Sequence, residues 1–242
     1  MRLSNLTALA AVLMLSAASA ARAGDAAALS ILGFSTDGGI FAFEEYGEQD
    51  GSGWAYANRF YIDTKTDTFL PGTPIRVRLE DESGTQEQAR QAARAKGEAI
   101  VADAELQAHQ GYTAAFNPIA ELSADPFRIV AASSAVYAQH TLEYRLEEID
   151  MQAPPSCEGF GAIKGYRLTS IDASPGGVTR LIHEDKSIPA GRNCPLGYRL
   201  GGVQVYFDDS GQGTAMVLLT VRSIGFEGPD YRWLAVSTRI AN

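Results

Sequence analysis

The sequence is poor in the residue types and motifs that most often mark enzymes. Its 242 residues include only 3 histidines, His109, His140 and His183, and 2 tryptophans. It contains no His-Glu-x-x-His pair, no glycine-rich phosphate loop, and no Gly-x-Ser-x-Gly or Ser-x-x-Lys nucleophile motif. These absences argue against zinc peptidases, nucleotide-dependent enzymes and the common serine hydrolases, and we expect no cofactor.

Basic residues are also scarce, since 20 lysines and arginines face 29 aspartates and glutamates, for a net charge of −9. A chain this acidic is a poor partner for nucleic acid or for an anionic membrane surface. Its hydrophobic content of 45% and its length are sufficient to bury a sizeable core. We therefore expect a globular protein that does not bind nucleic acid.

Long hydrophobic runs are absent beyond the N-terminus. Residues 1–23 combine the basic Arg2, an apolar run over 6–15 and the small-residue sequence Ala21-Arg22-Ala23, which are the three parts of a secretory signal. The run is too short to span a bilayer. Cleavage after Ala23 leaves 219 residues with 18 basic and 29 acidic side chains, a net charge of −11. We predict export to the periplasm or the medium, with no membrane span.

Cysteine is limited to one pair, Cys157 and Cys194. In an oxidising compartment two cysteines are most simply joined in a disulfide, here closing a loop of about 37 residues. A thiol redox pair or a metal site is the alternative, but neither cysteine belongs to a Cys-x-x-Cys motif. The prediction is a structural disulfide.

Short alternating apolar runs separated by glycine-rich turns dominate the remaining sequence and are typical of antiparallel β-structure. The clearest is a hairpin in which an Asp37-Gly38-Gly39 turn joins two apolar runs. We predict a mainly β (α+β) fold, an antiparallel β-sandwich, barrel or partial propeller, as a single domain over residues 24–242. The predicted strands cover 29–34, 40–44, 56–63, 69–70, 75–79, 127–131, 141–149, 164–171, 178–183, 198–207, 214–222 and 231–240.

One helical segment interrupts this pattern near residues 85–110. Ser83 and Thr85 each begin a capping-box pattern, and alanines recur at helical spacing after them. Gly97 lies within the run and costs a helix about 1 kcal/mol relative to alanine, so a kink or two helices are both compatible with the sequence. The apolar stripe is thin, and we expect it to pack on a sheet.

Two resemblances add to this interpretation. Residues 33–64, with the turn Ser35-Thr36-Asp37-Gly38 and the strand Tyr61-Ile62-Asp63, resemble a single blade of the TolB-type propellers. The whole mature chain resembles a family of predicted secreted bacterial proteins known only as a domain of unknown function. The residues that carry this second resemblance lie in 43–47, 49–53, 74–82, Cys194-Pro195 with Tyr198, and 225–230. It implies secretion and a single unit, and it transfers no catalytic residue.

The most unusual segment is the acidic, glycine-rich loop over residues 44–53. Its carboxylates could hold Ca²⁺ or another divalent cation, although the spacing differs from an EF-hand loop. A solvated acidic loop is the simpler interpretation. Glu44 and Glu45 would point to opposite faces of a strand, which disfavours a glycosidase pair. The candidate cation or ligand residues, which include a second acidic turn expected to approach this loop, are Glu44, Glu45, Asp50, Glu227 and Asp230.

These observations favour a non-catalytic exported binding or accessory module for a protein, peptide or glycan partner. The alternative is a periplasmic hydrolase that uses acidic residues as acid and base. The two hypotheses differ in what they require of the structure. A hydrolase needs a pocket with two carboxylates about 5–10 Å apart, and a binding module does not.

Overall fold

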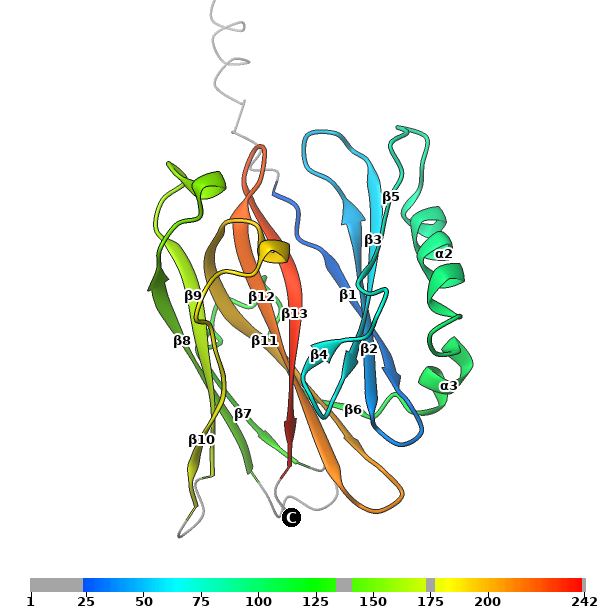
Figure 1. Cartoon of the computed structure of the whole chain (residues 1–242), viewed down its shortest axis with the longest axis vertical. Helices are drawn as coiled ribbons and strands as arrows, with labels where there is room; N and C mark the ends of the chain where they lie inside the picture. Colours follow the sequence, from blue (N-terminus) through cyan, green and yellow to red (C-terminus); the bar gives the residue numbers. More distant parts are fainter. Residues whose placement is uncertain (1–23, 134–140, 173–176, 241–242) are drawn as a thin grey trace, which may run out of the picture.

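In a computed structural model that describes residues 24–133, 141–172 and 177–240, three antiparallel sheets and a pair of helices are stacked in four layers (Figure 1). The helix-covered sheet contains β1 (Ala28–Phe34), β2 (Ile40–Glu48), β3 (Ala55–Asp63), β4 (Thr68–Phe69) and β5 (Ile75–Arg78). The central sheet contains β6 (Tyr112–Phe116), β11 (Pro195–Phe207), β12 (Gly213–Ile224) and β13 (Pro229–Arg239). The outer sheet contains β7 (Arg128–Ala132), β8 (Thr141–Met151), β9 (Ile163–Ile171) and β10 (Thr179–Glu184).

The central sheet is buried on both faces. Along β12, Val217 and Leu219 pack in the core shared with the outer sheet, while Met216 and Leu218 pack in the core shared with the helix-covered sheet. Successive side chains of a strand point to opposite faces, so a strand between two cores must be apolar at nearly every position. This explains the continuous hydrophobic run in β12.

The two faces of the helix-covered sheet differ in the size of their side chains. Phe41, Phe43 and Phe60 face the central sheet, and alanines such as Ala42 and Ala57 face the helices. The small side chains allow α2 (Gln86–Gly97) and α3 (Asp103–Ala108) to lie close to the strands. The predicted helical insertion is confirmed as two helices packed on a sheet, and the Thr85 capping box begins the first of them.

The predicted mainly β fold with a helical insertion is confirmed. The sheets are stacked and form no closed barrel, and residues 33–64, the blade-like segment, lie within the helix-covered sheet (Figure 1). The sequence analysis did not predict β6. It is a short strand at the edge of the central sheet, and its partly buried residues do not alternate.

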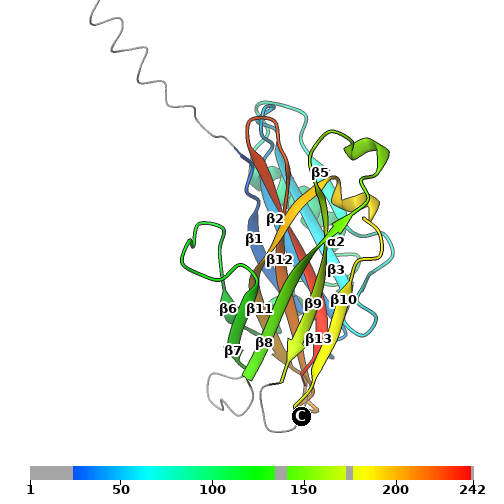
Figure 2. The ribbon, with the colours of Figure 1, turned by 90° about the vertical axis from the view of Figure 1, so that its left-hand side faces the viewer.

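The disulfide prediction is also confirmed, since Cys157 and Cys194 are bonded with 5.4 Å between their Cα atoms. Cys157 ends the 3₁₀ turn η1 (Pro155–Cys157) between β8 and β9, and Cys194 follows the 3₁₀ turn η2 (Ala190–Arg192) before β11. These turns lie at the same end of the molecule, beside the outer sheet (Figure 2). The proposed signal lies outside the described residues, in which no helix is long and apolar enough to cross a membrane.

Candidate functional site

Two adjacent glutamates of β2, Glu44 and Glu45, line two different pockets. In the register of the sheet, Glu44 of β2 lies opposite Arg59 of β3, and Glu45 of β2 lies opposite Asn58 of β3. Asn58 in turn lies opposite Arg76 of β5. Neighbouring residues of a strand point to opposite faces, as predicted for this pair. Glu44 faces the helices and Glu45 faces the central sheet. Each side chain lines its own pocket.

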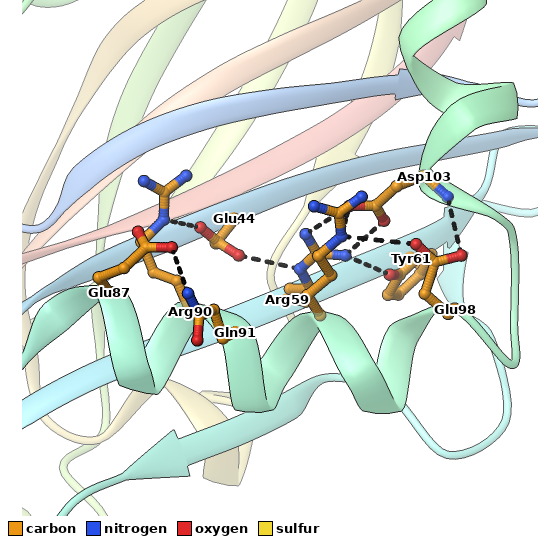
Figure 3. A network of polar contacts seen from close by, with 9 residues as sticks. Glu44, Arg59, Tyr61, Glu87, Arg90, Gln91, Glu98 and Asp103 are labelled. Atoms are coloured by element: carbon orange, nitrogen blue, oxygen red, sulfur yellow. Dashed lines mark hydrogen bonds and ion pairs between the residues drawn. The ribbon is translucent and has the colours of Figure 1, made fainter.

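On the helix side, Arg59 joins two buried carboxylates (Figure 3). Its Nε donates to Glu44 Oε2 at 2.9 Å, and its Nη1 and Nη2 donate to the two oxygens of Asp103 at 2.7 and 3.0 Å. The three side chains are 5% exposed or less, so each charge depends on the others for compensation. Burial alone would lower the pKa of Arg59, but the hydrogen bonds to Asp103 and Glu44 outweigh it and raise the pKa, which keeps the guanidinium charged.

Two arginines of α2, one helical turn apart, extend this network toward solvent. Arg90 donates its Nε to Glu44 and lies 4.1 Å above the ring of Tyr46. The Nε of Arg94 forms an ion pair with Asp103 at 3.0 Å and donates a hydrogen bond to Glu98 at 3.5 Å. No hydrogen bond joins their Nη groups to any residue in the part of the chain that the structure describes. A buried carboxylate therefore orients each guanidinium, and the outer nitrogens remain available to a ligand.

Arg90 and Arg94 line a pocket of about 340 Å³ between the helices and β1, which we call the arginine pocket. Its other polar walls come from Ser30, Glu87, Gln91, Gln107 and Gln110. The formal charges of its three arginines are balanced by Glu44, Glu87 and Asp103. The pocket therefore offers directed hydrogen bonds, with guanidinium forks that match a carboxylate, rather than a strong positive field.

The second pocket, of about 230 Å³, lies where the edge strand β13 meets β3, β5 and η2, and we call it the edge pocket. Glu45 accepts hydrogen bonds there from Asn58 Nδ2 at 2.9 Å and from the backbone N–H of Trp233 at 2.8 Å. Burial raises the pKa of Glu45 and these two hydrogen bonds oppose that rise. The second bond also satisfies a backbone donor at the outer edge of β13.

Of the remaining acidic residues of the predicted site, Asp50 and Glu227 are in contact, and Asp230 bonds elsewhere. Asp50 accepts a hydrogen bond from the backbone N–H of Glu227 at 2.7 Å, so the acidic loop does meet the later turn. Asp230 lies farther along this turn and accepts from the backbone N–H of Asp25. Among the described residues, no three His, Cys, Asp or Glu side chains are grouped so as to hold a metal ion, and cation binding stays a prediction.

The sequence analysis did not single out Arg59, Arg90, Arg94 or Asp103. Two arginines at i and i+4, each directly after a core-facing alanine, are a signal that the sequence contains. Asp103 could not have been found in this way, because its partner Arg59 is 44 positions away in the chain.

The stacked sheets, the disulfide and the two polar pockets define a mainly β protein with a helical layer. The chain belongs to a family described as "Predicted secreted protein (DUF2259)", whose model matches residues 42–239. No curated protein and no solved structure gives a significant match. The family confirms the second resemblance and is consistent with export, and its description names no function.

Proposed function

We propose that this chain is an exported, non-catalytic binding module that holds a carboxylate group of its ligand in the arginine pocket. The observation that carries the proposal is the pair Arg90 and Arg94, whose Nε atoms form ion pairs with buried carboxylates and which both line an open pocket. Guanidiniums fixed in this way lose little side-chain entropy when a ligand binds, which favours affinity.

The lining favours an acidic saccharide as the ligand class. Three glutamine amides and Ser30 can both donate to and accept from hydroxyl groups, and the apolar contribution is limited to Ile31 and Leu32. A pocket whose formal charges balance suits one carboxylate among hydroxyls better than a multiply charged phosphate. An acidic peptide offers the same carboxylate but brings apolar side chains for which the pocket has little surface.

The occupied carboxylates speak against the hydrolase alternative at this site. Both oxygens of Glu44 and both oxygens of Asp103 accept hydrogen bonds from arginine side chains. A general acid or base must present a free oxygen to the substrate, and these two carboxylates have both oxygens engaged by arginine side chains. The edge pocket contains one lining carboxylate, Glu45, rather than the pair that the alternative requires.

Calorimetric titration of the mature chain with a uronic-acid oligosaccharide, its neutral counterpart and an acidic peptide tests the proposal. We expect the uronic-acid oligosaccharide to bind, and Arg90→Gln or Arg94→Gln to weaken that binding about tenfold or more, because each removes a charge-assisted hydrogen bond. Arg78→Gln is the matched control, since Arg78 is an exposed arginine of β5 paired with Glu80 away from the pocket.

Equal binding of the neutral oligosaccharide would contradict a role for the carboxylate. Tighter binding of the acidic peptide would assign the pocket to a different ligand class. If both arginine variants bound the uronic-acid oligosaccharide as the wild type does, the arginine pocket would not be the site.

A further inference from the structure

The edge pocket is built from two sheets, the helix-covered and the central one, together with the η2 turn, and it is separate from the arginine pocket. Glu45, Asn58 and Arg76 form a row across β2, β3 and β5 because they are register partners in the helix-covered sheet. Trp233 from the central sheet and Arg192 from η2 close the opposite side. Their convergence is a product of tertiary structure, since these residues span nearly the whole chain.

Two of the three guanidiniums that line the edge pocket are already compensated. Arg192 pairs with the buried Asp185 and lies 4.9 Å above the ring of Tyr166. Arg232 pairs with the buried Asp25 and likewise stacks on an aromatic ring, that of Tyr56, at 4.8 Å. These two side chains are fixed parts of the wall.

Arg76 is different from both. It makes no hydrogen bond and no ion pair within the described residues, and its positive charge acts on Glu45, two strands away. Its Nη2 lies 3.8 Å from the position that a Cβ on Gly191 would occupy, so its head group reaches across to η2. Arg76 is therefore the guanidinium of this pocket that can take a carboxylate from a ligand.

Glu45 offers the complementary charge. An ionised carboxylate has about four acceptor positions, and Asn58 and the Trp233 backbone use two of them. A ligand ammonium could use the remaining capacity and would also offset the cost of burying this carboxylate. The pocket thus presents one available anion on β2 and one available cation on β5, on either side of β3.

The remaining wall is apolar, with Phe60, Val221, Trp233 and Leu234 beside the charged row. From these observations we propose that the edge pocket binds a free amino acid with an apolar side chain. Its ammonium lies at Glu45, its carboxylate at Arg76 and its side chain against Trp233 and Leu234. The volume of about 230 Å³ suits a ligand of this size and is small for a larger cofactor.

The test compares leucine with two analogues that each lack one charged group, 3-methylbutylamine and 4-methylpentanoate, by calorimetry on the mature chain. We expect leucine to bind and both analogues to bind about tenfold more weakly or worse, because each leaves one charged side chain of the pocket without its partner. Arg76→Gln should weaken leucine binding to a similar extent. Arg76 is an exposed residue, so this substitution should not affect folding.

Arg78→Gln is the control on the same strand, and Arg90→Gln should leave leucine binding unchanged, which separates this site from the arginine pocket. Equal binding of 4-methylpentanoate would make this a simple anion site and overturn the role of Glu45. No leucine binding at millimolar concentration, or full binding by Arg76→Gln, would overturn the proposal.

Discussion

Arg59 shows how one side chain can hold a sheet and a helix together. It is 4% exposed and gives all its side-chain nitrogens to Glu44, Asp103 and the hydroxyl of Tyr61. Three charges in this position are not in themselves strong evidence of stability, because the cost of removing them from water offsets much of their attraction. Their arrangement fixes the direction of Arg90 and Arg94, and that is its consequence for the site.

We expect Arg59→Met to lower the free energy of unfolding by about 3–5 kcal/mol, because it leaves Glu44 and Asp103 buried without their shared counter-charge. Urea unfolding followed by tryptophan fluorescence measures the change. Arg78→Gln, which breaks the exposed pair with Glu80, should change stability by less than about 1 kcal/mol. Equal effects of the two substitutions would show that the buried network does not compensate its charges as described.

At the scale of elements, the junction of α2 and α3 depends on Gly97. Ala89, Ala93 and Gly97 form a row of small residues on the sheet-facing side of α2, and Gly97 is the point of closest approach. A Cβ on Gly97 would lie 2.1 Å from the hydroxyl oxygen of Tyr61, a side chain that is fully buried. Glycine is required here by packing, although its φ angle is ordinary for a helix.

We expect Gly97→Ala to destabilise the protein by about 1–3 kcal/mol, the usual cost of an overpacked core. Helix propensity alone predicts the opposite sign, a gain of about 1 kcal/mol. Lys96→Ala, one residue earlier on the exposed side of α2, is the matched control and should stay within about 0.5 kcal/mol. Thermal and urea unfolding of the two variants distinguish packing from propensity, and a stabilised Gly97→Ala would refute the contact with Tyr61.

The same scale explains what could be predicted from the sequence. The strands β2, β3, β8 and β12 were predicted because alternation and turn residues are local signals that survive in a single sequence. Strand β6 was missed because it is a short strand whose partner, β11, lies about ninety positions away in the chain. The site was missed for a related reason, since the Glu44–Arg59 pair depends on hairpin register and the Arg59–Asp103 pair depends on how the helices return to the sheet.

At the scale of the molecule, the central sheet links every layer. Its two faces complete separate cores. The disulfide joins the turn between β8 and β9 of the outer sheet to the residue before β11 of the central sheet. If either neighbouring sheet unfolded alone, the central sheet would expose a hydrophobic face to water. We therefore propose that residues 24–242 unfold as one unit, in keeping with a single domain.

This proposal predicts how two neighbouring substitutions behave. Leu218 faces the helix-covered sheet and Leu219 faces the outer sheet, and both are almost fully buried. Leu218→Ala and Leu219→Ala should each lower the free energy of unfolding by about 2–5 kcal/mol, since each leaves a cavity in a different core. The control Leu181→Ala, at an exposed leucine of β10, should change it by less than about 0.5 kcal/mol.

The shape of the transition is the more informative result. If the layers unfold together, each core substitution moves one cooperative urea transition, with the same midpoint by fluorescence and by circular dichroism. Two transitions, of which Leu218→Ala moves one and Leu219→Ala moves the other, would show that the cores are independent. The chain would then consist of two domains that share the central sheet. A ligand in the edge pocket, which is lined by the helix-covered and central sheets and by η2, would then stabilise the part of the chain whose transition Leu218→Ala moves.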